Sequence, residues 1–196
     1  MYTWGYIKDA TLAKLDLTQE EANVMGLLNR FPFYANEVIT QISSSIKPKH
    51  CYWELLITKD SVGKTMTLED TSFVSFSDEA ATITYDDYNL KFTEECHDDV
   101  LVYTGYNTVR CLREGSYLIP YNARWYTFSK STPETEILKV PHDILECIPS
   151  YIAHQCYKID DEYKSAVYRN EYEMFLARID DSRSITTSTL KIGGDW

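Results

Sequence analysis

The chain has 196 residues, a formal net charge of −11 and 44% hydrophobic residues, among them 16 tyrosines. This apolar content is enough to build a core and excludes a disordered protein. The basic residues are scattered among Asp and Glu, which argues against tight binding to nucleic acid, because a phosphate backbone is bound through clustered Lys and Arg.

The opening sequence MYTWGYIKDATL has neither a basic start nor a continuous apolar run, so we expect no signal peptide. No apolar run approaches the ~18 residues that a membrane helix needs. These features predict a protein that is assembled in a cytosol without a membrane contact.

The five cysteines are odd in number and form no CxxC pair, which favours free thiols over a disulfide framework. They are Cys51, Cys96, Cys111, Cys147 and Cys156. The pairs His50-Cys51 and Cys96-His97 offer possible zinc ligands, but adjacent residues of a strand point to opposite faces. We therefore expect no metal site.

The first 49 residues are predicted to be helical. Apolar residues recur at helical spacing from Ile7 to Leu15, and Thr18 with Glu21 forms a capping-box pattern that begins a second helix. Pro32 suits the first turn of a third helix, which Pro48 ends. The expected buried side of this third helix is Tyr34, Ala35, Val38, Ile39 and Ile42.

From Cys51 the apolar period changes from helical to alternating, with Cys51, Trp53, Leu55 and Ile57 on one face of a strand. Further short strands are predicted at Phe73 to Phe76, Ala81 to Tyr85, Leu90 to Thr93, Val100 to Thr104, Val109 to Leu112, Tyr117 to Tyr121 and Trp125 to Phe128. This spacing predicts an antiparallel β-sandwich over residues 50–140, inserted into a helical domain of residues 1–49 and 141–181. The predicted fold class is therefore α+β.

The segment from Pro141 to Asp180 is predicted to be a helical hairpin. Pro149 is expected to kink or divide its first helix. Asp160, Asp161 and Glu162 then supply an N-cap and acidic charge for a second helix, at the end where the helix dipole is positive.

The second helix of the hairpin carries apolar residues on two faces. Tyr163, Val167, Met174 and Ala177 share one face, which we expect to pack on the first helix through Ile148, Ile152 and Tyr157. Tyr168, Tyr172, Phe175 and Ile179 share the other face. This aromatic face is either part of an ordinary core or a contact with another subunit, and we predict Tyr168, Tyr172 and Phe175 as an oligomer interface.

Residues 182–196 are rich in Ser and Thr and cannot form a core alone. We predict an extended C-terminal arm that docks on a partner through Ile185, Leu190, Ile192 and Trp196. The alternative is a frayed tail.

The sequence contains no GxGxxG, Walker, HExxH or GxSxG motif. The acidic pairs Asp86-Asp87, Glu94-Glu95 and Asp98-Asp99 are interpreted as solvated turns. His142 and His154 have no Ser or Cys at a spacing that indicates a nucleophile and its base. We therefore predict no catalytic residues and no cofactor.

Residues 148–179, IPSYIAHQCYKIDDEYKSAVYRNEYEMFLARI, resemble the closing helices of tailed-bacteriophage head–tail connector proteins, the adaptor or neck rings beneath the portal. In that family a proline and aromatic pair opens a helix, a short acidic turn follows, and a helix with an aromatic-rich centre ends the domain. The matching positions are Pro149, Tyr151, Ala153, Asp160, Asp161, Ala166, Tyr168, Asn170, Glu171, Tyr172 and Glu173. The opening helices, around Ala35-Asn36-Glu37, and the segment from Gly115 to Ala123 are similar more loosely.

The resemblance implies a structural virion protein and not an enzyme. It would form a ring of identical subunits, commonly twelve-fold, between the portal and a tail or stopper protein, with DNA passing through without specific binding. Two alternatives remain. One is a carbohydrate-binding or adhesion module that uses Trp53 and Trp125 on the β-sandwich, and the other is a hydrolase with dispersed carboxylates.

Overall fold

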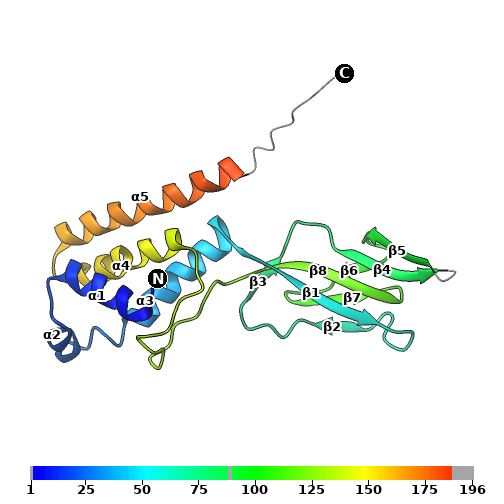
Figure 1. Cartoon of the computed structure of the whole chain (residues 1–196), viewed down its shortest axis with the longest axis horizontal. Helices are drawn as coiled ribbons and strands as arrows, with labels where there is room; N and C mark the ends of the chain where they lie inside the picture. The colour runs from blue at the N-terminus through cyan, green and yellow to red at the C-terminus, as the bar shows by residue number, and fades with distance from the viewer. Residues whose placement is uncertain (1, 88–89, 187–196) are drawn as a thin grey trace, which may run out of the picture. The chain divides into compact units, whose positions relative to one another are not determined.

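The computed structural model describes residues 2–87 and 90–186 of the chain (Figure 1). The chain divides into two compact units. The helical unit comprises Met1–Lys47 and Trp125–Trp196, and the β unit comprises Pro48–Arg124. This confirms the predicted α+β class, with antiparallel sheets between N-terminal and C-terminal helices.

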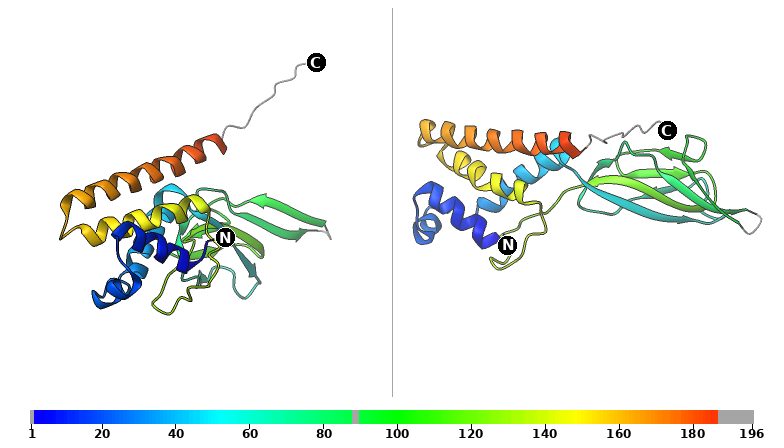
Figure 2. Two further views of the ribbon diagram at one scale, coloured as in Figure 1. Left: turned by 60° about the vertical axis from the view of Figure 1, so that its left-hand side comes forward. Right: turned by 45° about the horizontal axis from the view of Figure 1, so that its top comes forward.

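The helical unit begins with α1 (Trp4–Leu15), α2 (Gln19–Val24) and α3 (Phe31–Gln41), which a π-helical turn, η1 (Ile42–Ile46), extends. It ends with α4 (His142–Tyr157) and α5 (Glu162–Thr186). The predicted capping box is confirmed, since Thr18 and Glu21 exchange hydrogen bonds at the start of α2. In Figures 1 and 2, α4 lies between α5 on one side and α1 and α3 on the other. No helix in the described ranges is long and apolar enough to span a membrane.

Pro149 lies inside α4, which is not divided, and the kink that was the other expectation stays a prediction. The second closing helix is longer than expected. Helix α5 continues to Thr186, because no Pro or Gly interrupts the sequence after Glu162, so residues 182–186 are helical and not extended. Ile185 therefore belongs to α5, whereas Leu190, Ile192 and Trp196 lie outside the described residues.

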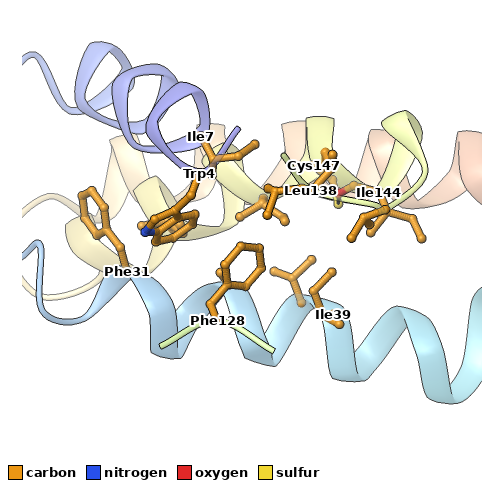
Figure 3. Close-up of a cluster of buried hydrophobic side chains, with 14 of the residues drawn as sticks. Trp4, Ile7, Phe31, Ile39, Phe128, Leu138, Ile144 and Cys147 are labelled. Carbon is orange, nitrogen blue, oxygen red and sulfur yellow. Dashed lines mark hydrogen bonds between the residues drawn. The ribbon is translucent and has the colours of Figure 1, made fainter. Parts of the chain in front are cut away.

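The core of the helical unit gathers apolar side chains from all its main helices (Figure 3). Trp4 of α1 and Phe31 of α3 are fully buried, and Phe128 lies with its ring centroid 4.5 Å from that of Trp4. The predicted buried side of α3 is also confirmed: Ala35, Val38 and Ile39 have no exposed surface. This packing makes both ends of the chain parts of one core.

The segment that returns from the β unit was predicted to contain a strand from Trp125 to Phe128, and this prediction is wrong. The Asn36 amide donates to the Phe128 carbonyl at 2.9 Å and accepts from the Phe128 N–H at 2.7 Å. A side chain of α3 thus takes the place of a neighbouring strand. Further along, the Glu134 carbonyl accepts from the Gly5 N–H and the Glu136 carbonyl accepts from the Trp4 N–H. These two N–H groups lie in the first turn of α1 and have no acceptor within the helix itself.

The β unit has two antiparallel sheets. The larger has the order β1–β8–β4–β5, with β3 also paired to β8, and the smaller has the order β2–β7–β6. The strands are β1 (Lys49–Ile57), β2 (Thr65–Thr67), β3 (Phe73–Phe76), β4 (Thr82–Asp87), β5 (Leu90–Glu95), β6 (Leu101–Tyr103), β7 (Thr108–Cys111) and β8 (Gly115–Ala123). The predicted alternation of β1 is confirmed, because Tyr52, Glu54 and Leu56 are exposed while the residues between them are more buried. Ile57 and Ile119 of the large sheet share a core with Val109 of the small one.

Candidate functional site

The hairpin of α4 and α5 carries most of the residues that the sequence singled out. Asp161 caps α5, because its carboxylate accepts from the N–H of Lys164 at 2.9 Å. Across the hairpin, the Tyr157 ring stacks on the Tyr168 ring, with centroids 5.9 Å apart. The predicted acidic turn therefore starts α5 as expected.

The three predicted interface residues face the interior of their own helical unit. Tyr172 is 5% exposed and its hydroxyl donates to the Gln41 side chain of α3 at 2.8 Å. Burial raises the pKa of this hydroxyl well above its ordinary value. Tyr168 donates to the Lys14 carbonyl at the end of α1 at 2.6 Å, and Phe175 is half-buried against the same core. These side chains hold α5 to α1 and α3, so Tyr172 in particular has no surface to offer a neighbour.

The opposite face of α5 is exposed, although we had expected it to pack on α4. Tyr163 is 80%, Val167 46% and Met174 59% exposed. Asn170 and Ala177 are exposed between and after them. We name these five residues the outer strip. The two faces were assigned the wrong way round, because the tyrosine hydroxyls of the aromatic face find carbonyl and amide partners on α1 and α3, which the sequence pattern does not reveal.

A serine–histidine pair, which the sequence reasoning missed, joins α4 to α5. The Ser165 hydroxyl lies 2.8 Å from Nδ1 of His154 and 3.3 Å from the His154 carbonyl. Ser165 is 6% exposed, and within the described residues no carboxylate is hydrogen-bonded to the imidazole. The pair thus serves as a polar contact between two packed helices and lacks the orienting acid of a catalytic triad. In the sequence, the contact is indicated only by the positions of the two residues, with His154 before the hairpin turn and Ser165 after it.

The remaining candidate chemistry does not converge in the part of the chain that the structure describes. No three His, Cys, Asp or Glu side chains there form a group that could hold a metal ion. The cysteines are free thiols, two of them buried and three half-buried. Burial raises the pKa of Cys96 and Cys156 to about 11, which keeps these thiols protonated and weakly nucleophilic at neutral pH.

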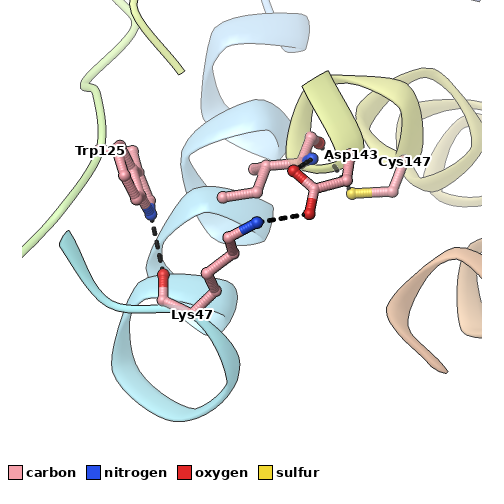
Figure 4. A network of polar contacts seen from close by, with 5 residues as sticks. Lys47, Trp125, Asp143 and Cys147 are labelled. Atoms are coloured by element: carbon pink, nitrogen blue, oxygen red, sulfur yellow. Dashed lines mark hydrogen bonds and ion pairs between the residues drawn. The ribbon is translucent and has the colours of Figure 1, made fainter. Parts of the chain in front are cut away.

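The two tryptophans of the carbohydrate-binding alternative are engaged within the protein. Trp53 is half-buried against the β core. The indole of Trp125 donates to the Lys47 carbonyl at 2.8 Å, while the Lys47 ammonium lies 2.6 Å from the Asp143 carboxylate (Figure 4). Trp125 therefore fastens the point where the chain leaves and re-enters the helical unit, and the two indoles do not form an open platform for a sugar ring.

Comparison with known proteins gives no assignment: no family model matches the chain, and no curated protein matches it.

Proposed function

We propose that the chain is a structural subunit of a phage neck, a head–tail connector that forms a ring of identical copies between the portal and the tail or stopper. The resemblance of residues 148–179 supports this proposal. In the fold these residues make the α4–α5 hairpin, with Asp161 at its turn and Asn170 on its outer face.

The observation that carries the proposal is the outer strip of α5. Tyr163, Val167 and Met174 leave large apolar surfaces in water along one helix, although the other face of that helix is firmly packed. Exposed apolar side chains that gather along one helix face mark a candidate protein contact. A protein whose work is assembly needs such a surface, whereas an enzyme or a ligand-binding module does not.

A ring also needs a second, different surface on each subunit. A contact that closes into a ring is heterologous, so one patch meets another patch of the next copy. Besides the outer strip, the helical unit exposes Val24 and Met25 at the end of α2 and Phe33 in α3. These side chains are 83%, 56% and 62% exposed. They are our candidates for the second surface.

The net charge of −11 suits a DNA passage. An acidic wall repels the phosphate backbone, so DNA can move past it without being held. The proposed partners are therefore other copies of the chain, a portal protein and a tail or stopper protein, with DNA as a passing cargo.

Deletion of the gene from a phage that encodes this chain tests the proposal. We expect filled heads and separate tails that do not join, with joining restored by supplying the unsubstituted chain. Cryo-electron microscopy of complete particles should then place the helical unit in repeated copies around the neck. Finding the chain at the tail tip, or obtaining normal particles without it, contradicts the proposal.

A further inference from the structure

The outer strip has the spacing of a coiled-coil seam. Its residues follow one another at intervals of four, three, four and three positions, from Tyr163 through Val167, Asn170 and Met174 to Ala177. This is the heptad spacing by which one helix packs along another. Helix α5 has 25 residues and is therefore about 37 Å long, so it offers a straight surface for such a contact.

We propose that the outer strip of α5 pairs in antiparallel orientation with the outer strip of a second copy of this chain. In the best register, Val167 lies opposite Asn170 of the second copy, and Tyr163 lies opposite Met174 of the second copy. The two-fold axis repeats each of these contacts, so four layers of side chains cover Tyr163, Val167, Asn170 and Met174 on both helices, and Ala177 lies beyond the last layer. In this register Tyr163 packs against Met174 of the second copy, so neither of these large side chains has to pack against the same residue of the other helix.

Charge complementarity favours a second copy as the occupant. Lys164 and Glu171 border the strip on the same side, one heptad apart. In the antiparallel register each Lys164 lies beside the Glu171 of the other copy, which gives two ion pairs across the seam. Glu171 already accepts from Lys14 at 2.8 Å, and its side chain keeps 36% of its surface exposed for a second donor.

The ends of the helix favour the antiparallel orientation over the parallel one. A parallel pair would bring together two acidic turns, each with Asp160, Asp161 and Glu162, and two helix N-termini of the same polarity. The antiparallel pair instead places the exposed Arg178 of one copy near the acidic turn of the other.

The pairing occurs in the free protein, before assembly, and would regulate when a subunit can join the neck. A two-fold contact joins two copies and stops, so it cannot close a ring. It covers the outer strip before assembly, and the pair must open when a subunit joins the neck. Only this last step rests on the proposed function.

Light scattering or sedimentation of the full chain, from low to high micromolar concentration, tests the pairing. We expect a monomer–dimer equilibrium that Met174→Lys shifts to monomer, with a rise of about tenfold or more in the dissociation constant. Phe33→Lys is the matched control, because Phe33 is similarly exposed on the same unit but lies off the strip. Circular dichroism should show that both variants remain folded. A chain that is monomeric at every concentration overturns the proposal, and so does a dimer that Met174→Lys leaves unchanged.

Cysteine cross-linking tests the orientation. A mixture of Val167→Cys and Asn170→Cys chains should form a disulfide-linked dimer, whereas Met174→Cys chains alone should not, because their two thiols lie at opposite ends of the seam. The unsubstituted chain, oxidised in parallel, accounts for its five native cysteines. Cross-linking of Met174→Cys with itself, without the mixed dimer, would show a parallel pair and overturn the proposal. If the chain forms the dimer in solution but is absent from the neck of the phage particle, the pairing stands and only the proposed function is refuted.

Discussion

At the scale of single residues, polar side chains fasten irregular segments that have no strand or helix of their own. Asn36 holds the backbone of Phe128 through both atoms of its amide. Its neighbour Glu37 accepts from the Tyr151 hydroxyl at 3.1 Å and so links α3 to α4. These contacts give both Asn36 and Glu37 a structural role.

Replacing Asn36 with Ala should destabilise the helical unit by about 1 to 3 kcal/mol, because the N–H and carbonyl of Phe128 lose their partners. Phe128 is only 3% exposed, so water cannot easily replace the amide. Urea unfolding followed by the helical circular dichroism signal measures the loss. Asn23→Ala, at an exposed position of α2, is the control and should change stability by less than about 0.5 kcal/mol. Equal stabilities of the two variants would show that Asn36 does not hold the segment.

Asp70 makes the stability of the β unit depend on pH. Burial raises the pKa of this carboxyl, but hydrogen bonds from Ser72 and Tyr121 outweigh that effect and lower the pKa below its ordinary value. A carboxyl whose folded pKa lies below its unfolded value of about 3.9 stabilises the fold fully above that value and loses the effect as pH falls through the folded pKa.

The Asp70→Asn variant should therefore be less stable than the unsubstituted chain at pH 7, and the difference should shrink below about pH 4. Unfolding curves of the β unit at several pH values, followed by tyrosine fluorescence, measure this convergence. Asp78→Asn, in an exposed turn, should differ little from the unsubstituted chain at pH 7. A stability gap for Asp70→Asn that stays constant down to pH 2 would contradict the assignment.

At the scale of elements, the sequence predicts that a helix has two apolar faces but not which one is buried. Spacing alone defined both faces of α5. The choice between them depends on where α1 ends, because the Tyr168 hydroxyl reaches the Lys14 carbonyl only after the end of α1 has packed on the α4–α5 hairpin. Similarly, the alternation of β1 was readable from Cys51, Trp53, Leu55 and Ile57 at every second position, although Leu56 on the exposed face is also apolar. Strand β2 has only three residues and left no pattern.

The two faces of α5 predict opposite effects of truncation. Tyr172→Ala should cost about 3 to 5 kcal/mol, because it opens a cavity in the helical core and leaves the Gln41 amide without its partner. Met174→Ala, two residues further on and on the outer strip, should change the stability of the monomer by less than about 0.5 kcal/mol. Urea unfolding at low protein concentration, where the chain is monomeric, compares the two. A larger loss for Met174→Ala would mean that the outer strip is covered within its own subunit.

At the scale of the whole molecule, a change of apolar period marks the inserted unit, but its far boundary cannot be read from the sequence. The sandwich was predicted to extend to residue 140, with a last strand from Trp125 to Phe128, whereas the contacts of residues 125–140 place them in the helical unit. Phe128 packs on Trp4 there, and the carbonyls of residues 134 and 136 complete the start of α1. These partners are more than a hundred residues away along the chain, beyond the reach of any local pattern.

The helical unit should fold without the β unit. The chain leaves it at Lys47 and returns at Trp125, and the hydrogen bond of 2.8 Å between these residues means that a short Gly-Ser linker can replace Pro48–Arg124. We expect the shortened chain to keep its helical circular dichroism signal and a cooperative unfolding transition. Trp125→Phe in the shortened chain keeps the aromatic ring but removes the donor to the Lys47 carbonyl, and should cost about 1 kcal/mol. A shortened chain that does not unfold cooperatively would show that the helical core needs the β unit. The two units would then be separate in their contacts but would not fold independently.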